Sequence, residues 1–293
     1  MSRSHKPRIL IQLDADPQPS SFDSVVAVDS GVDRILSYGN VALDQVEPLV
    51  HGAIFTRGMD DLRRTAIFIG GSDVDQGERM LERVAGSFLG PLSVSVMMDA
   101  NGSNTTAAAA VLAARAHLDL ASITALVLAG TGPVGQRAAR LLSGEGANVR
   151  LASRSMQRAK AAADRVNRAL GTERVAPCTS SDDPALAAAL DGVELVIAAG
   201  AAGVELLPAE ALEAAEGVKV AIDLNAVPPA GIEGVNVTDK GADLGGSGPV
   251  KAYGAIGVGG MKMKIHKAAI ASLFEANDRV LDADQIYELG KTL

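Results

Sequence analysis

Three glycines spaced as GxGxxG, at Gly130, Gly132 and Gly135, are the residues of this chain whose spacing most directly implies chemistry. The apolar run 125–129 before them predicts a buried strand, and the apolar spacing over 136–142 predicts a helix. In a strand–loop–helix unit such glycines permit a tight turn, a close approach of the backbone to a pyrophosphate, and close packing of helix on strand. Free N–H groups at the helix start also favour phosphate. The motif therefore predicts a dinucleotide site, with loop residues Gly130, Thr131, Gly132, Pro133, Val134 and Gly135.

The end of the next predicted strand, 148–153, indicates which dinucleotide would bind. Sites for NAD usually carry Asp or Glu there, to hold the ribose 2′-hydroxyl. This chain has Ser153, Arg154 and Ser155 instead, with Arg158 one helical turn further on. A guanidinium can donate two parallel hydrogen bonds to a phosphate, and no carboxylate is present to repel one. We therefore expect NADP; the alternative is that Arg154 is an ordinary surface residue at a helix start.

Two further predicted strands, 195–199 and 218–224, are each followed by residues expected near a nicotinamide ring, because ligands of such folds lie at the carboxyl ends of strands. The Pro228-Pro229 pair that follows the second of these strands is a candidate for a cis peptide bond. The residues expected to contact the nicotinamide are Ala199, Gly200, Ala201 and Asn225.

A polar run follows the predicted strand 93–97 and contains Asp99, Asn101, Asn104 and Thr105. Carboxylate and amide groups together present hydrogen-bond donors and acceptors, so this run could bind a polar heterocycle. The alternative is an Asx turn followed by a helix cap at Asn104. The residues alone leave both interpretations open.

Lys262 is the lysine of the segment 261–274 that falls on the apolar face when the segment is turned by about 100° per residue. It shares that face with Ile265, Ala269 and Leu273, whereas Lys264 and Lys267 fall on the opposite side. Buried lysines usually have a partner or a task. We therefore expect Lys262 near the first turn of a helix and in a functional role; the alternative is that its ammonium reaches water while its stem packs.

Two histidines receive only structural roles. Neither His51 nor His266 has a carboxylate partner that the sequence reveals, so we expect both to be structural.

Composition narrows the class of protein. The 293 residues suggest two domains, and the net charge of −8 argues against a nucleic-acid partner. One cysteine excludes an internal disulfide, and the four histidines lack metal-ligand spacing, so no metal site is expected. We see neither a signal peptide nor a membrane-spanning run, and expect a cytoplasmic protein.

The order of predicted elements gives the fold. We expect an α/β protein of two domains with a cleft between them: a small amino-terminal α/β domain and a Rossmann dinucleotide-binding domain. Residues 1–104 plus 266–293 would form the first, and 105–265 the second. The remaining predicted strands are 8–13, 34–37, 65–69 and a closing piece at 253–256; the remaining predicted helices are 20–27, 44–50, 73–88, 104–118 and 282–289.

Taken together, these residues resemble the NADP-dependent methylenetetrahydromethanopterin dehydrogenases of methylotrophic bacteria, some of which also use methylenetetrahydrofolate. The resemblance covers almost the whole chain, and its specific parts are the Asn-Gly-Ser-Asn-Thr-Thr and Gly-Gly-Met-Lys runs. It implies an important lysine at Lys262, a 2′-phosphate contact from Arg154, and pterin contacts from Phe22 and Asp23 as well as from the 99–105 run. It also implies a homo-oligomer, a trimer or a hexamer. The matching segments are 21–23, 38–41, 66–71, 99–106, 128–135, 225–232, 255–262 and Phe274.

The resemblance implies that a hydride leaves the methylene carbon of a reduced pterin for NADP and produces a methenyl cation in one-carbon metabolism. An ammonium would oppose that cation, so we expect Lys262 to be neutral or to contact the pterin carbonyl. Two alternatives remain open: a shikimate-type dehydrogenase, which expects a Lys–Asp pair that Asp23 or Asp99 could complete, and a non-enzymatic NADP-binding regulator. The residues do not decide between methanopterin and folate.

Overall fold

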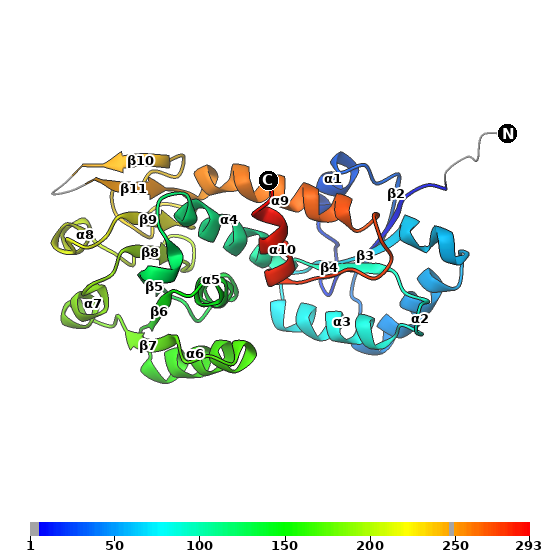
Figure 1. Cartoon of the computed structure of the whole chain (residues 1–293), viewed down its shortest axis with the longest axis horizontal. Helices are drawn as coiled ribbons and strands as arrows, with labels where there is room; N and C mark the ends of the chain where they lie inside the picture. Colours follow the sequence, from blue (N-terminus) through cyan, green and yellow to red (C-terminus); the bar gives the residue numbers. More distant parts are fainter. Residues whose placement is uncertain (1–5, 246–248) are drawn as a thin grey trace. The chain divides into compact units, whose positions relative to one another are not determined.

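The chain folds into two compact units, which the computed structural model describes over residues 6–245 and 249–293. Unit 1 comprises Met1–Thr105 with Met263–Leu293, and unit 2 comprises Thr106–Lys262. The chain passes from one unit to the other within two helices, α4 (Ser103–Arg115) and α9 (Ala255–Ser272). Each unit contains one sheet of its own (Figure 1).

The sheet of unit 1 has five parallel strands in the order β12-β4-β3-β1-β2. The strands β1 (Ile9–Leu13), β3 (Thr65–Ile69) and β4 (Ser95–Met98) are central and almost wholly buried, which explains their continuous apolar sequences. The edge strands are β2 (Arg34–Tyr38) and β12 (Val280–Leu281). The helices of this unit are α1 (Ser21–Asp29), α2 (Leu43–Ile54), α3 (Val74–Gly86) and α10 (Ala283–Gly290), with the short 3-10 turns Met59–Arg64 and Ala100–Gly102.

The strand order of unit 1 identifies where a ligand would bind. Numbered along the chain, the strands are arranged 2-1-3-4-5, an order in which the connections change direction between the first and third strands. In Figure 1, α1 and α3 accordingly lie on opposite sides of the strands. Ligands of open α/β sheets bind at such a switch point, outside the carboxyl ends of the strands. In unit 1 this point lies beyond Leu13 of β1 and Ile69 of β3.

The sheet of unit 2 has seven strands in the order β10-β11-β9-β8-β5-β6-β7. All neighbours are parallel except β10 and β11, which form an antiparallel pair. Without β10, the order is 3-2-1-4-5-6, that of the Rossmann fold, and its switch point lies between β5 and β8. The strands are β5 (Thr124–Leu128), β6 (Asn148–Ser153), β7 (Val175–Thr179), β8 (Leu195–Ala198), β9 (Val220–Asp223), β10 (Lys240–Leu244) and β11 (Val250–Tyr253).

Helices cover both faces of the unit 2 sheet. In Figure 1, α5 and α6 lie on one side of the strands, and α7 and α8 on the other. The core around α7 and α8 is built from fully buried aliphatic residues such as Leu126, Val196 and Ala221. The bounds of these helices are Pro133–Gly144 for α5, Met156–Leu170 for α6, Asp183–Leu190 for α7 and Ala209–Ala214 for α8, and a 3-10 turn occupies Leu120–Ser122.

Several of the expected element boundaries are wrong, most clearly at the start of the last long helix. The final long helix begins at Ala255 and not at Met261, so the piece expected to close the sheet at 253–256 is half helical, and β11 ends at Tyr253. The glycines in the first turns of this helix are more typical of a loop, so the sequence pattern did not predict a helix there. Gly257 is needed for packing, because a Cβ at this position would overlap the carbonyl group of Asp239. The helix expected over 136–142 begins earlier, at Pro133, a residue well suited to a first helical position.

Candidate functional site

The glycine loop of unit 2 connects β5 to α5 at the switch point of the sheet. Two of its glycines are required by the protein itself. A Cβ on Gly130 would lie 2.8 Å from Leu151 Cγ, and a Cβ on Gly135 would lie 2.6 Å from Gly130 Cα. Gly130 and Gly135 therefore allow the loop to pack against β6 and the helix to pack against the loop.

Gly132 differs from its two neighbours in the motif. A Cβ at this position would come no closer than 3.9 Å to the protein, where it would meet the carbonyl oxygens of Ala129 and Ala199. Its φ of −76° is one that any residue adopts, and it stands immediately before the first turn of α5. Nothing within the fold requires glycine here, so the missing side chain leaves room for something outside the fold. A pyrophosphate at a helix N-terminus is the group that fits this cradle.

The loop is held firmly on both sides of Gly132. The Gly130 N–H donates to the Ala152 carbonyl oxygen at 2.9 Å, and Gln136 Nε2 donates to the Thr131 carbonyl oxygen at 2.8 Å. Ala129 has a φ of 50°, a left-handed conformation that costs a residue with a side chain roughly 1–2 kcal/mol. Such strain is maintained only where the surrounding structure enforces it.

The end of β6 presents two exposed guanidinium groups beside a helix start. Ser155 Oγ caps α6 by accepting from the Arg158 N–H at 3.4 Å, and Ser153 Oγ accepts from the Ser155 N–H at 3.3 Å. Arg154 and Arg158 are exposed, and the first turn of α6 contains no acidic residue. The two serines thus stabilise the turn, and the helix start and the two arginines offer positive charge to an anion.

The loops expected near the nicotinamide are joined to each other. Asn225 is mostly buried; its Nδ2 donates to the Pro229 carbonyl oxygen at 2.9 Å, and its Oδ1 accepts from the Val227 N–H at 3.0 Å and the Gly203 N–H at 3.4 Å. The Pro228-Pro229 bond is cis, which confirms the sequence prediction. The amide of Asn225 therefore braces the loop after β9 against the loop after β8, where Ala199 and Gly200 are half-buried and Ala201 is exposed.

Asp223 is a residue of this region to which the sequence analysis gave no role. Its buried carboxylate accepts from the N–H groups of Asn225 at 3.0 Å, Gly231 at 2.7 Å and Ile232 at 3.2 Å. Burial raises the pKa of the Asp223 carboxyl, and these backbone hydrogen bonds oppose the rise. A carboxylate at the last position of a buried strand, followed by an Asn-x-x-Pro-Pro loop, was the signal that could have identified it.

In unit 1, carboxylates gather at the switch point between β1 and β3. Asp14 follows β1 and is fully buried; its two carboxylate oxygens accept from the Asp16 N–H at 2.8 Å and the Ser20 N–H at 3.3 Å. Burial raises the pKa of the Asp14 carboxyl against the effect of these hydrogen bonds. Gly70 follows β3, and a Cβ there would lie 3.3 Å from Asp14 Oδ2 and 3.6 Å from Asp23 Oδ2. Both carboxylates therefore border the same small space.

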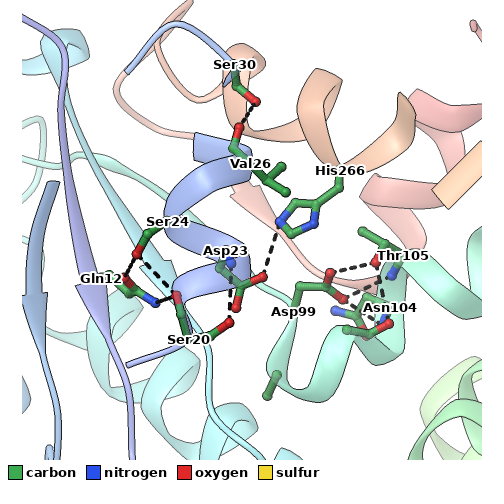
Figure 2. A network of polar contacts seen from close by, with 12 residues as sticks. Gln12, Ser20, Asp23, Ser24, Val26, Ser30, Asp99, Asn104, Thr105 and His266 are labelled. Atoms are coloured by element: carbon green, nitrogen blue, oxygen red, sulfur yellow. Dashed lines mark hydrogen bonds and ion pairs between the residues drawn. The ribbon is translucent and has the colours of Figure 1, made fainter. Parts of the chain in front are cut away.

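The start of α1 supplies Phe22 and Asp23, both expected to contact the pterin. Phe22 is 51% exposed, whereas the Asp23 side chain is 13% exposed. Ser20 caps the helix, since its Oγ accepts from the Asp23 N–H at 3.2 Å. Asp23 Oδ1 lies 3.9 Å from Nε2 of His266 on α9 (Figure 2). The expectation that His266 has no carboxylate partner is therefore wrong: the partner is 243 positions away and no sequence pattern connects the two.

The polar run after β4 is engaged mainly in holding α4. Asp99 Oδ1 accepts from the N–H groups of Asn104 at 2.9 Å and Thr105 at 3.0 Å, and Asp99 Oδ2 accepts from Thr105 Oγ1 at 2.6 Å. Asn104 Nδ2 donates to the Met98 carbonyl oxygen at 2.7 Å and to Asp282 Oδ1 at 3.0 Å. These three side chains are buried, while Asn101 is exposed with a φ of 53°. The predicted cap at Asn104 is wrong in its residue, because Asp99 accepts from the first turn of α4.

Lys262 lies in the third turn of α9 and not in its first turn, because the helix begins at Ala255. It is half-buried and lies on the helix face of Ile265 and Ala269, which are fully buried, as is Leu273 just beyond the end of the helix. Lys264 is exposed, and Lys267 Nζ lies 2.8 Å from Asp29 Oδ2. Lys264 is thus more exposed than Lys262, whereas Lys267 is half-buried like Lys262, so burial alone does not separate Lys262 from both other lysines.

A metal-binding cluster and a membrane-spanning helix are both absent from the part of the chain that the structure describes. Residues 6–245 and 249–293 contain no group of three or more histidine, cysteine, aspartate or glutamate side chains arranged to hold a metal ion. Within the same ranges, no helix is both long enough and apolar enough to cross a membrane.

Comparison with known proteins adds the following similarities. A family model described as the N-terminal domain of methylene-tetrahydromethanopterin dehydrogenase matches residues 21–101. The chain is 47% identical over 288 residues to the bifunctional protein MdtA of Methylorubrum extorquens, covering 98% of this chain and 99% of that protein. It is 34% identical over 284 residues to an NAD(P)-dependent methylenetetrahydromethanopterin dehydrogenase of the same organism, covering 92% of this chain and 93% of that protein.

Solved structures with much lower sequence identity share the fold. A shikimate 5-dehydrogenase from Listeria monocytogenes matches with a TM-score of 0.52 at 11% identity, covering 99% of both chains. A quinate dehydrogenase from Corynebacterium glutamicum matches with a TM-score of 0.51 at 14% identity, covering 98% of this chain and 100% of the other. At these identities the likeness concerns the fold alone.

Proposed function

Because the chain belongs to the methylene-tetrahydromethanopterin dehydrogenase family, we propose that it transfers a hydride from methylene-tetrahydromethanopterin to NADP and releases the methenyl-pterin. The observation that carries the proposal is the open space at Gly132, since the fold does not need glycine there but a pyrophosphate does. Methylene-tetrahydrofolate is the second substrate that we include.

Unit 2 is proposed to hold NADP. The N-terminus of α5 would bind the pyrophosphate, and Arg154 with Arg158 would bind the 2′-phosphate beside the start of α6. The braced loops at Ala199–Ala201 and Asn225 would border the nicotinamide, whose C4 accepts the hydride when the cofactor is bound.

Unit 1 is proposed to hold the pterin at its switch point. The exposed ring of Phe22 offers an apolar face, and Asp23 offers a partly exposed carboxylate. Hydride loss leaves a cation shared by two pterin nitrogens, and a nearby carboxylate stabilises such a developing charge. No proton has to move in this step, so the work of the side chains is to orient the pterin and to keep its reacting carbon aligned.

The decisive test is an assay of the purified chain with both methylene-pterins and both nicotinamide cofactors. Absorbance changes from NADPH and from the methenyl-pterin should rise together in equal amounts. NADP binding without turnover of either pterin would indicate the regulator instead, and turnover of shikimate or quinate would indicate a different dehydrogenase.

Lys262 is proposed to contact the pterin at its carbonyl, away from the new cation. Lys262→Ala is then expected to lose turnover or pterin affinity, and Lys264→Ala, an exposed lysine of the same helix, to change neither. Unchanged turnover and unchanged pterin KM in Lys262→Ala would remove the residue from the site. Lost turnover with normal pterin binding would replace the binding role with a role in the chemical step.

We further propose that the protein is a cytoplasmic homo-oligomer, a trimer or a hexamer. The family resemblance and the many small residues, which allow close helix packing, support the oligomer; the single cysteine supports a compartment that does not favour disulfides. Light scattering after size-exclusion chromatography tests the first statement, and cell fractionation the second. A monomeric mass at micromolar concentration would overturn the oligomer.

A further inference from the structure

His266 is a fully buried histidine at the edge of the proposed pterin subsite. It lies on α9 and contacts residues from two other elements of unit 1. Its ring stacks on Phe68 of β3, with the ring centres 5.7 Å apart and an angle of 21° between the planes. On α1, the Phe22 ring centre is 6.2 Å away and tilted by 40°, and Asp23 Oδ1 is 3.9 Å from His266 Nε2.

Burial decreases in order from His266 towards solvent. The imidazole is 0% exposed, the Asp23 side chain 13% and Phe22 51%. Of these three side chains, Phe22 and Asp23 are therefore the ones that a ligand at the carboxyl ends of β1 and β3 can contact, and the fully buried His266 can influence such a ligand through them.

The contacts of His266 restrict how both residues can turn. Asp23 has its backbone N–H held by Ser20 Oγ, and its carboxylate points toward the imidazole of His266 (Figure 2). A Cβ on Gly70 would lie 3.6 Å from the other carboxylate oxygen, Asp23 Oδ2. The distance of 3.9 Å exceeds that of a direct hydrogen bond, so the attraction between these groups is electrostatic or passes through water. The tilted ring of Phe22 neighbours the same imidazole, which also stacks on the buried ring of Phe68.

We propose that His266 is a positioning residue for the pterin, because it sets the orientation of Asp23 and Phe22 on the wall of the subsite in unit 1. The inference rests on the proposed function, since it concerns how that substrate is held. His266 performs this role with both parts of its side chain: the ring orders Phe22 against Phe68, and the nitrogen Nε2 orders the carboxylate of Asp23.

Two substitutions separate the ring from the nitrogen. His266→Phe keeps an aromatic ring beside Phe22 and Phe68 and removes the nitrogen that faces Asp23. His266→Gln keeps a polar atom at a similar reach and removes the ring. We expect His266→Phe to lower kcat/KM for the methylene-pterin about tenfold or more, the scale of a misplaced substrate contact, with the KM for NADP and the Kd for NADPH unchanged. In a background where Phe22 is replaced by leucine, the ring of His266 no longer has an aromatic partner on α1. In that background, His266→Gln should lower the pterin kcat/KM less than His266→Phe does.

A double-mutant cycle with Asp23→Asn tests whether the histidine acts through the carboxylate. We expect His266→Phe to cause little further loss of pterin kcat/KM once Asp23 is replaced by asparagine. The matched controls are His51→Phe, a histidine of α2 that contacts only the ring of Phe55 among the aromatic contacts described, and Asp29→Asn, at the opposite end of α1. Both controls should keep the wild-type pterin KM.

The outcomes are distinct. Multiplicative losses in the cycle, or an NADP KM that rises in parallel with the pterin KM, would show a general structural role and overturn the proposal. If His266→Phe does not fold, His266→Leu, which also lacks the nitrogen, provides the cycle with and without Asp23→Asn. Wild-type protein that turns over neither pterin would overturn the proposed function together with this inference, whereas normal wild-type turnover with an uncoupled cycle overturns the inference alone.

Discussion

Gly132→Ala should separate cofactor binding from folding, because the space at this glycine is needed by the ligand and not by the protein. The new methyl group would stand 3.9 Å from the carbonyl oxygens of Ala129 and Ala199, an ordinary contact distance, and the φ of −76° suits alanine. Alanine lowers the entropy of the unfolded chain, which stabilises by about 0.4–1 kcal/mol, and it is a poorer helix cap than glycine by a similar amount. The free energy of unfolding should therefore stay within about 1 kcal/mol of wild type.

The effect on NADP should be much larger. A methyl group between the start of α5 and a pyrophosphate would displace the phosphate from the N–H groups, and a hydrogen bond to a charged group contributes about 1.5–3 kcal/mol. At 1.36 kcal/mol for each factor of ten, the Kd for NADPH should rise about 10- to 150-fold. Calorimetric titration gives this Kd, and thermal unfolding of the same samples without cofactor gives the stability.

Two further glycines of α5 serve as comparisons. Gly135→Ala places a Cβ 2.6 Å from Gly130 Cα, so the backbone must move, and we expect a loss of about 1–3 kcal/mol in stability. Gly144→Ala, at the opposite end of the helix, meets nothing within 4 Å and should leave both Kd and stability close to wild type or slightly improved. If Gly132→Ala binds NADPH as tightly as wild type, the pyrophosphate does not lie over this loop and the reasoning is refuted.

Three other measurements test individual residues. Arg154→Ala should raise the KM for NADP about 10- to 100-fold, through loss of a charge-assisted phosphate contact, and leave the KM for NAD unchanged. Arg168→Ala, at the exposed far end of α6, should change neither KM. Equal losses for both cofactors would contradict a 2′-phosphate contact. Burial raises the pKa of the Cys178 thiol to about 11 from an ordinary 9.0, so alkylation at pH 8 should be about 100-fold slower in the folded protein than in urea, and equal rates would contradict this burial. Because the pKa of Asp223 is raised in the folded state, the stabilising contribution of this residue is complete below its unfolded pKa and is lost as pH rises through its folded pKa. The loss of stability in Asp223→Asn, measured by urea unfolding, should therefore become smaller as pH rises. A loss that grows with pH would show that the pKa is shifted in the opposite direction.

Local sequence patterns correctly predicted the elements that are determined by residues adjacent in the sequence. The strands β3 and β6 have the predicted bounds: β3 is a buried, largely apolar run that ends before Gly70, and β6 carries the buried residues Val149, Leu151 and Ala152 and ends at Ser153, just before the cap of α6. The helix predicted over 20–27 begins at Ser20, whose hydroxyl caps α1 in the structure. In each case the residues that determine the element are adjacent in sequence.

Sequence patterns did not predict the elements and contacts that depend on a segment far away in the chain. The strand β7 was not predicted, since it contains Pro177; its position at the edge of the sheet removes the need for a second hydrogen-bonding partner. The first turns of α9 were missed because their glycines indicate a loop, and their requirement is set by the backbone around Asp239. The approach of Asp23 to His266 depends on α1 and α9 meeting across one unit, and residue spacing contains no information about that meeting.

The polar residues at the strand ends divide into two groups with different consequences for mutation. Asp14, Asp99 and Asp223 are buried carboxylates that each accept at least two hydrogen bonds, from the backbone or from a hydroxyl, so they hold the loops after β1, β4 and β9. Removing such an acceptor leaves buried N–H groups unsatisfied and costs about 1–3 kcal/mol for each group. Phe22 of unit 1 and Arg154 of unit 2 are instead exposed, so their substitution removes little buried contact. Substitution of the buried carboxylates should therefore lower stability, and substitution of Phe22 or Arg154 should weaken ligand binding without lowering stability. Lower stability after substitution of Phe22 or Arg154, with unchanged stability after substitution of the carboxylates, would contradict this division.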